Sequence, residues 1–383
     1  MPSSALPPPV VVADRDGLDQ LVAGLAPHAI VAVDTESNSL HAYRERICLI
    51  QFSAPDADYI VDPIALPDLS PLASLFANPH VQKVFHAAEY DLLCLRRDYG
   101  FEFTNIFDTM SAARTLGWPQ VGLAAILDTH FGVTMNKKYQ RADWKRRPLT
   151  SEQLDYARLD THHLVALRDK QIEALTAAGR LDEAREEFER LTRMRGDADN
   201  TARSPAAFWK VKGARELAPR QAAVLEALFA YREQQAERID RPPFMVMGEA
   251  TLMELVRREP RSAEDLQGVP GMTPEQIRRH VVAVLQAIRR GLDAPAQFAP
   301  PVIRETDDVQ NRYDRLHNWR KARAKARGVE SDVILPRSAL WDLARRPPRT
   351  AADLAQIADL GPWRRTTYGS EILALLGAGA GHD

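Results

Sequence analysis

The chain has 383 residues, a net charge of −2, and an ordinary mixture of 45% hydrophobic and 27% charged residues, which predicts about two or three folded domains and excludes global disorder. No apolar stretch approaches the roughly 18 residues of a membrane span, and the Ser- and Pro-rich N-terminus has neither the basic start nor the apolar core of a secretory signal. Two cysteines, Cys48 and Cys94, exclude a disulfide framework, so we expect a protein of the reducing cytoplasm that has no membrane contact.

The small net charge hides an asymmetry between the two halves. Residues 1–200 carry a net charge of −8, and residues 201–383 carry +6. Acidic groups gather cations and basic groups attract polyanions, so we expect the halves to have different tasks. The alternative is that a surplus of +6 spread over the second half is too weak to matter.

The first half has the pattern of an α/β domain. Val-, Ile- and Phe-rich runs of strand length occupy residues 29–33, 47–52, 59–61 and 81–85, with a hairpin tip at 56–58. Helical patterns follow at about 89–98, 109–116, 121–130 and 151–178. The last of these opens on the capping-box sequence Thr150–Gln153 and stops at Gly179. This order predicts a mixed sheet flanked by helices.

The second half, beyond residues 197–204, reads as entirely helical and contains an internal repeat. Apolar positions recur at an offset of 88 residues; for example, Leu228 matches Leu316 and Leu252 matches Leu340. Recurring core positions are typical of a duplicated helical unit. We therefore expect two small all-α bundles, at residues 205–292 and 302–378, joined by a Pro- and Ala-rich linker at about 291–301.

Three short motifs place acidic side chains next to predicted strands and on a helix. Asp34 and Glu36 follow the first strand at a spacing that leaves both on one face. Such close carboxylates repel each other and favour a hard cation such as Mg²⁺. Asp91 follows the strand 81–85, and Tyr156 and Asp160 lie one turn apart on the helix 151–178. Taken singly, each motif also fits a surface turn, a helix-dipole acid or a core-edge tyrosine.

Together the motifs resemble the tyrosine subclass of the four-acid exonuclease superfamily. The resemblance rests on Asp-Thr-Glu after the first strand, His86-Ala-x-x-x-Asp after a later strand, and Tyr-x-x-x-Asp on a helix. The sequences Arg141–Trp144 and Arg147–Thr150 are similar to the ribonuclease D branch of that superfamily. The resemblance implies a ribonuclease-H-like 3′-5′ exonuclease domain over residues 1–200.

The second half resembles the helicase-and-ribonuclease-D C-terminal (HRDC) domain. The similarity rests on the segment from Ala218 to Arg232, on Pro242-Pro243-Phe244, and on the turn Gly268-Val-Pro-Gly271. The second copy is degenerate, because residues 357–361 replace that turn. An exonuclease domain followed by two such units resembles bacterial ribonuclease D over nearly the whole chain.

The resemblance implies a cytoplasmic bacterial 3′-5′ exoribonuclease, expected to be a monomer, that trims structured RNAs with a single-stranded 3′ end, such as tRNA precursors. It implies two divalent ions, Mg²⁺ or Mn²⁺, which hydrolyse the terminal phosphodiester and release nucleoside 5′-monophosphates. By motif position Asp34, Glu36 and Asp160 would bind the first ion, and Asp34 with Asp91 the second. Tyr156, with Glu36, would orient the attacking water.

Basic and aromatic residues before the Tyr156 helix are candidates for RNA contact. This set contains Lys137, Lys138, Tyr139, Arg141, Trp144 and Arg147. The alternative is a solvated loop that Trp144 anchors to the core. Leu40 and His41, which follow the Asp-Thr-Glu motif, are expected to contact the last nucleotide.

Other polar residues receive structural or open interpretations. His162 and His163 are interpreted as structural, and Asp108 as the cap of the helix that begins at residue 109. A basic run from Arg320 to Arg327 is either a solvated helix face or a footprint for folded RNA. The motifs leave two other functions open, a DNA 3′-5′ exonuclease and a non-catalytic nucleic-acid-binding protein.

Overall fold

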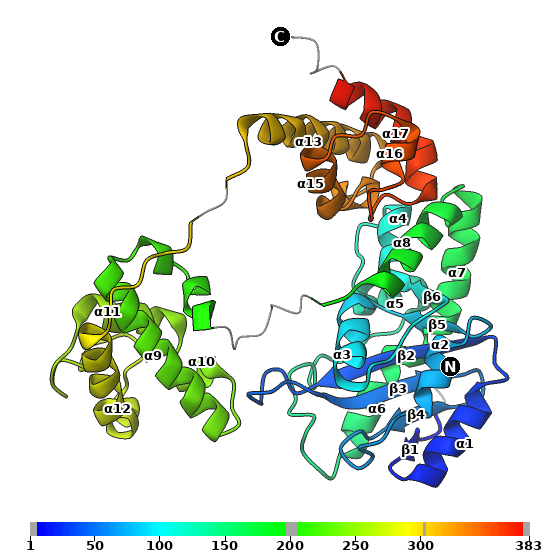
Figure 1. Cartoon of the computed structure of the whole chain (residues 1–383). Coiled ribbons are helices and arrows are strands. Elements are labelled where there is room, and N and C mark those ends of the chain that lie inside the picture. The colour runs from blue at the N-terminus through cyan, green and yellow to red at the C-terminus, as the bar shows by residue number, and fades with distance from the viewer. Residues whose placement is uncertain (1–5, 197–204, 302–303, 378–383) are drawn as a thin grey trace. The chain divides into compact units, whose positions relative to one another are not determined.

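The computed structural model describes residues 6–196, 205–301 and 304–377. These residues form two units (Figure 1). The first contains the chain up to residue 37, residues 47–195 and the C-terminal part from residue 304. The second contains residues 38–46 and 196–303. The domain boundary expected at 197–204 lies outside the described residues.

A six-stranded mixed sheet forms the centre of the first unit (Figure 1). Its strands are β1 (Val10–Val12), β2 (Ile30–Ser37), β3 (Ile47–Ser53), β4 (Asp58–Val61), β5 (Gln82–Phe85) and β6 (Ile106–Asp108). The order across the sheet is β1-β4-β3-β2-β5-β6, with β2 and β4 both antiparallel to β3 and the remaining pairs parallel. The mixed sheet expected from the sequence is therefore confirmed.

Strand β2 continues four residues beyond its predicted end. The sequence analysis places Asp34 and Glu36 after the strand, but both lie within it, because β3 continues to pair with β2 as far as Ser37. Pairing holds the backbone extended, so the two carboxylates project from the same face of the sheet. The longer strand thus fixes the carboxylates more firmly than a loop would.

Eight helices of the first unit surround the sheet. They are α1 (Arg15–Leu25), α2 (Leu72–Ala77), α3 (Glu89–Tyr99), α4 (Thr109–Leu116), α5 (Leu123–Phe131), α6 (Ser151–His162), α7 (Leu164–Ala177) and α8 (Leu181–Arg193). The single helix predicted over 151–178 is wrong, because the chain leaves the helix at His163. The break follows His162, whose Nδ1 lies 2.9 Å from the Asp58 carboxylate. That contact confirms a structural use of His162.

The second unit is a helical bundle, built from α9 (Pro219–Arg238), α10 (Pro243–Val246), α11 (Glu249–Arg258) and α12 (Pro274–Asp293). The C-terminal helices that belong to the first unit are α13 (Asp307–Arg327), α14 (Ser331–Ile334), α15 (Arg337–Arg345), α16 (Ala351–Leu354) and α17 (Pro362–Gly377). Helices α9, α10, α11 and α12 begin 88 residues before α13, α14, α15 and α17 respectively. The repeat seen in the apolar positions is therefore also a repeat of helices.

The linker predicted at about 291–301 begins later than expected. Helix α12 continues to Asp293, and Gly291 is buried against α9. A Cβ at residue 291 would lie 2.4 Å from the Val224 Cα, so glycine permits this close helix contact. The glycine that resembled a linker residue is therefore a packing residue.

Helix α8 joins the α/β part of the first unit to the C-terminal helices through buried ion pairs. Arg364 of α17 is 2% exposed, and its Nη1 lies 2.9 Å from Glu186 Oε1 of α8. Arg327 of α13 donates to Glu183, which is a fully buried residue of α8. A Cβ on Gly361 would lie 2.1 Å from the Glu186 Cδ, so this glycine makes room for the glutamate. The second helical copy is thus fitted to α8 by charge and by shape.

The structure also shows what most of the cations in the basic run on α13 contact. Arg320 is 8% exposed and donates to the Leu335 carbonyl oxygen, while Arg323 and Arg327 pair with Glu371 and Glu183. Lys321 and Lys325 are exposed. Arg323 is also exposed despite its pair with Glu371, so the solvated face extends over three of the five cations, whereas Arg320 and Arg327 bind other parts of the chain and take no part in a continuous RNA footprint.

Candidate active site

Asp34 and Glu36 project from β2 towards helix α6. In the β2–β3 register, Asp34 lies opposite Gln51 and Glu36 lies opposite Leu49. Leu49 packs in a small apolar cluster with Ala157 of α6, which identifies this face of the sheet as the one that α6 covers. Both carboxylates are partly buried there.

Asp91 lies in the first turn of α3 and is 7% exposed. Its Oδ1 accepts a hydrogen bond from the Thr35 hydroxyl, which ties α3 to β2 beside Asp34 and Glu36. The turn that precedes α3 is unusual, because Ala87 has a positive φ of 64°. The Ala88 amide donates to Asp108 Oδ2 at 2.6 Å. This turn therefore directs Asp91 towards the edge of β2.

Asp108 also caps α4, as the sequence predicts. Its Oδ1 accepts a hydrogen bond from the Ser111 amide at 2.6 Å. The Thr109 hydroxyl donates to the Phe85 carbonyl oxygen, so the His86 Nδ1, 2.8 Å from that hydroxyl, donates to it. The cap confirms the prediction for Asp108, and the contacts of Asp108 and His86 strengthen the turn that carries Asp91.

Tyr156 and Asp160 lie one turn apart on α6. The helix opens on a capping box in which Thr150 and Gln153 exchange hydrogen bonds, as the sequence predicts. The Tyr156 ring packs against Tyr139 and Trp144, with both ring-centre distances 5.9 Å. These contacts fix the face of α6 that carries the phenol and the carboxylate.

The four carboxylates are close enough to raise one another's pKa. Burial raises the pKa of Asp34 well above its usual value, and the charges of Asp91, Asp160 and Glu36 raise it further. Burial, followed by the charges of Asp160 and Asp91, also raises the pKa of Glu36 well above its usual value. The expectation that these side chains share one site therefore agrees with their electrostatics.

The other two acids and the tyrosine belong to the same electrostatic group. Burial raises the pKa of Asp91 to about 7, with a further contribution from Asp108 and an opposing one from the Thr35 hydrogen bond. Burial and the charge of Asp91 raise the pKa of Asp160 to about 7. Burial and the carboxylates Asp160, Glu36 and Asp34 raise the pKa of the Tyr156 phenol, which stays protonated at neutral pH.

The donor set fits a hard divalent cation. Four carboxyl groups that share a partly buried site present oxygen ligands and an excess of negative charge, which Mg²⁺ and Mn²⁺ neutralise. Among the described residues no three His, Cys, Asp or Glu side chains already converge as a metal-binding group.

A small cavity beside Tyr156 is lined partly by the segment that carries the exposed basic residues predicted to bind RNA. The cavity measures about 230 Å³ and is lined by Tyr139, Glu152 and Tyr156 among others. Lys138 Nζ and the Tyr139 hydroxyl both reach Glu152, at 2.7 and 2.6 Å. Lys137 and Arg141 are exposed on the same segment. Leu40 is 42% exposed, and His41 is partly exposed on the same loop.

Two of the predicted RNA contacts are wrong. Trp144 is 1% exposed and packs beneath α6, so this ring anchors the loop to the core and does not face RNA. Arg147 donates to both Asp62 carboxylate oxygens and to the Cys48 carbonyl oxygen, among others. A guanidinium with its donors engaged in this way holds the loop against β3 and has none to offer a phosphate.

Sequence analysis also missed Gln51 and Thr35. Gln51 is the one strongly polar side chain in the apolar run of β3 and lies directly across from Asp34. A polar residue at a buried strand position, next to the acidic strand, was the available signal. Thr35, the middle residue of the Asp-Thr-Glu motif, was passed over because it is not acidic.

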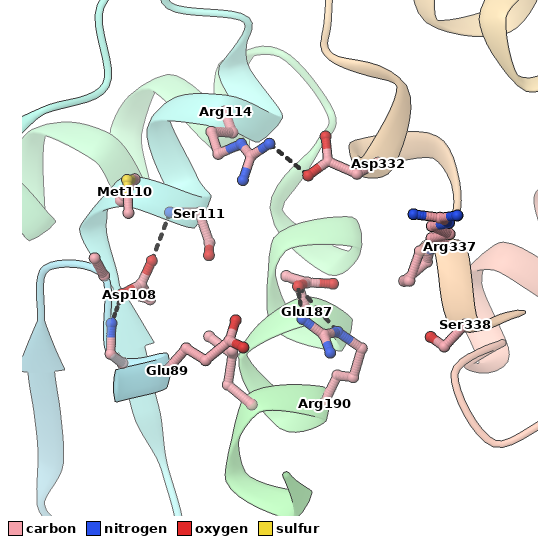
Figure 2. Close-up of a pocket in the computed structure, with 14 residues that line it drawn as sticks. Glu89, Asp108, Met110, Ser111, Arg114, Glu187, Arg190, Asp332, Arg337 and Ser338 are labelled. Atoms are coloured by element: carbon pink, nitrogen blue, oxygen red, sulfur yellow. Dashed lines mark hydrogen bonds and ion pairs between the residues drawn. The ribbon is translucent and has the colours of Figure 1, made fainter. Parts of the chain in front are cut away.

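A larger cavity, of about 460 Å³, lies elsewhere, between α3, α4, α8 and the C-terminal helices (Figure 2). Its walls mix charges of both signs. Arg114 pairs with Asp332, and Arg190 pairs with Glu187 at 2.7 Å (Figure 2). Asp34, Glu36, Asp91 and Asp160 do not line it.

Known protein families match most of the chain. Residues 9–174 match the 3′-5′ exonuclease family, and residues 221–288 and 309–376 each match the HRDC domain. Ribonuclease D of Jannaschia sp. is 30% identical over 96% of this chain and 95% of its own length. Among the described residues, none of the helices combines the length and apolarity that crossing a bilayer requires.

Two further relatives extend the comparison. The exosome complex exonuclease RRP6 of Saccharomyces cerevisiae is 29% identical over 92% of this chain, which spans about half (51%) of the yeast protein. The crystal structure of Escherichia coli ribonuclease D superposes with a TM-score of 0.68 at 23% identity, covering 97% of this chain and 99% of that one. The superposition with the Escherichia coli structure shows that the two chains share a fold.

Proposed function

The chain belongs to the ribonuclease D family, whose catalytic part is a 3′-5′ exonuclease domain, and we propose on this premise that it removes nucleotides from the 3′ end of RNA. The observation that carries the proposal is the group formed by Asp34, Glu36, Asp91, Tyr156 and Asp160, whose charges and burial shift one another's pKa. The products are nucleoside 5′-monophosphates.

Two divalent ions, Mg²⁺ or Mn²⁺, belong to this proposal. Asp34, Glu36 and Asp160 would hold the first, and Asp34 with Asp91 the second. The chemistry supplied by such ions is the acidification of a coordinated water and the neutralisation of charge on the phosphodiester. The neutral Tyr156 phenol donates a hydrogen bond that, with Glu36, orients the attacking water. A phenol whose pKa is raised does not act as the base at neutral pH.

The substrate in this proposal is a structured RNA with a single-stranded 3′ end, such as a tRNA precursor, in the bacterial cytoplasm. Lys137, Lys138 and Arg141 are exposed beside the cavity that Tyr156 lines, where they meet phosphates, and the Tyr139 ring offers a surface for a base. Leu40 and His41 contact the last nucleotide. The chain acts as a monomer.

The proposal also divides the chain by task. Residues 1–200 form the exonuclease domain, and residues 205–292 and 302–378 form two helical domains. Three separate sets of buried apolar residues support this division, one beneath the sheet, one in α9–α12 and one in α13–α17. The HRDC match of both helical parts supports a task in binding nucleic acid.

A 3′-end-labelled structured RNA and a DNA of matched sequence test the proposal, each with Mg²⁺ and with EDTA. We expect labelled mononucleotide from RNA with Mg²⁺ and none with EDTA. The variant Asp34→Asn should abolish release, whereas Asp169→Asn, an exposed acid on α7, should retain it. Equal or faster loss of DNA would identify a DNA exonuclease, and binding without release would identify a non-catalytic protein.

A further inference from the structure

Gln51 is a fully buried polar side chain in the middle of the sheet. It is 0% exposed, and within the described residues neither its Oε1 nor its Nε2 has a hydrogen-bond partner. Leaving a buried polar group unpaired costs about 1–3 kcal/mol. Few buried polar groups in native proteins lack a partner, and those that do call for an explanation, such as a role at a functional site. The amide therefore indicates a missing partner.

The register of the sheet places Gln51 directly beside Asp34. Gln51 pairs with Asp34 of β2 on one side and with Ile60 of β4 on the other. Directly paired residues project from the same face, with Cβ atoms about 5 Å apart. Asp34 is thus the nearest ionisable neighbour of Gln51 across the sheet.

Residues on either side of Gln51 show what covers it. Two positions before it, Leu49 packs with Ala157 of α6. Two positions after it, the Ser53 Oγ lies 2.7 Å from the Thr161 Oγ1, also of α6. Because alternate residues of a strand share a face, the Gln51 amide lies beneath the turn of α6 that carries Asp160.

A second buried glutamine shows a structural use of this side chain. Gln171 of α7 is also 0% exposed and its Oε1 has no partner among the described residues, but its Nε2 donates to the Thr109 carbonyl oxygen at 2.8 Å. That bond joins α7 to the start of α4. Gln51 makes no such bond to the described backbone, so joining two elements does not explain it.

We propose that Gln51 is a positioning residue of the carboxylate site, whose amide N–H donates to the Asp34 carboxylate and holds it in the orientation that a divalent cation needs. This inference rests on the proposed function. The amide N–H is a good hydrogen-bond donor to a carboxylate oxygen, and the β2–β3 register brings the two side chains to the same face of the sheet. Carboxylates that bind metals are usually held by such neighbours, whose loss weakens metal affinity about 10–100-fold.

The test compares Gln51→Met with the matched control Gln171→Met, because methionine keeps the length of the side chain and removes the amide. Mn²⁺ alone is titrated calorimetrically, and the Tm is measured in EDTA. We expect Gln51→Met to weaken the Kd for Mn²⁺ about 10–100-fold and to leave the Tm in EDTA unchanged or higher. Gln171→Met should lower the Tm in EDTA and leave the Kd unchanged.

Turnover adds a second measurement, since a positioning residue should lower kcat more than it raises KM. A wild-type Kd in Gln51→Met would overturn the inference while the proposed function stands. A loss of Tm in EDTA like that of Gln171→Met would also overturn it, since Gln51 would then be structural. Wild-type protein that binds no Mn²⁺ overturns both. If methionine prevents folding, Gln51→Leu repeats the comparison.

Discussion

The carboxylates of the candidate site carry an electrostatic cost in the metal-free protein. Burial raises the pKa of both Asp91 and Asp160 to about 7, and the pKa of Asp34 and Glu36 is raised as well. An unfolded aspartate has a pKa near 3.9, so the folded state binds more protons between about pH 4 and pH 7. Stability contributed by these groups is present below pH 4 and is lost as the pH rises through 7.

The first prediction concerns this pH dependence. In EDTA the Tm should fall by several degrees between pH 5.5 and pH 8, and saturating Mg²⁺ should remove most of the fall. Asp160→Asn should flatten the profile, because its side chain cannot ionise, and should raise the Tm at pH 8 while abolishing turnover. Scanning fluorimetry across the pH range measures this. A profile in Asp160→Asn that is as steep as in the wild type would contradict the electrostatic account.

The second prediction concerns the phenol of Tyr156. Tyr156→Phe removes one hydrogen-bond donor and leaves the ring contacts with Tyr139 and Trp144 in place. We expect kcat to fall about 10²-fold, with KM and the Kd for Mn²⁺ nearly unchanged. Steady-state kinetics on labelled RNA separates these quantities. A loss of Mn²⁺ affinity would instead show that Tyr156 supports the carboxylates.

At the scale of single residues, the spacing of the acidic residues in the sequence predicted the candidate site, whereas the burial of individual side chains could not be predicted. The sequence singled out Asp34, Glu36, Asp91 and Asp160, because charged residues at strand ends and on one helix face stand out against apolar runs. The sequence analysis named Trp144 as a candidate for RNA contact, because the sequence around an aromatic residue among cations is the same whether the ring faces solvent or the core. Which neighbour covers a side chain depends on tertiary packing, which one sequence does not contain.

At the scale of elements, the strands that carry the site were predicted within a few residues, whereas several covering helices were missed. Helix α1 was left unassigned although Asp14 caps it through the Gly17 amide, because two glycines within it weaken the helical pattern. Helix α8 was also left unassigned in the sequence analysis. In the structure Glu183 and Glu186 face arginines of distant sequence. Contacts over such separations leave no local signal.

The third prediction concerns the buried pairs of α8. Arg364→Met leaves Glu186 buried without its cation and should lower the free energy of unfolding by about 3 kcal/mol. Combining it with Glu186→Gln should recover part of that loss, because the unpaired charge is gone. Urea unfolding followed by tryptophan fluorescence is informative, since the Trp363 amide donates to Glu186 at 2.6 Å.

Arg365→Met is the matched control for this prediction. Arg365 adjoins Arg364, and the described contact of its guanidinium is a 2.7 Å hydrogen bond to the Leu360 carbonyl oxygen. Its replacement should therefore cost no more than about 1 kcal/mol. An equal loss of unfolding free energy in the Arg364 and Arg365 variants would show that the buried pair of Arg364 with Glu186 adds no more stability than an ordinary hydrogen bond.

At the scale of the whole molecule, the two helical copies have diverged at the positions that contact α8. Arg364, Arg327 and Gly361 of the second copy correspond, at the 88-residue offset, to Gln276, Ile239 and Thr273 of the first. The first copy therefore lacks both the cations and the small residue that accommodate the glutamates. The positive charge of the second half suggested RNA binding. Part of this charge instead joins the second copy to α8 of the acidic first half, through Arg327 and Arg364.

The fourth prediction follows for RNA binding by the whole chain. Of the basic run on α13, Lys321 and Lys325 are exposed, whereas Arg320, Arg323 and Arg327 are engaged within the chain. Each phosphate contact with a single strand adds about 0.7 to the slope of log Kd against log salt concentration. If both lysines contact phosphates, replacing both by alanine in the inactive Asp34→Asn chain should therefore reduce this slope by about 1.4, measured by anisotropy of a labelled structured RNA.

The matched control removes the same charge from another surface, with Lys170→Ala and Arg193→Ala, both exposed on α7 and α8. This control should leave the slope unchanged, because salt dependence counts the cations that meet phosphates and not the net charge of the chain. A slope that is unchanged in the Lys321 and Lys325 variant would mean that the second copy does not touch RNA. The remaining positive charge of α13 would then serve only the contacts with α8, with Glu371 and within its own bundle.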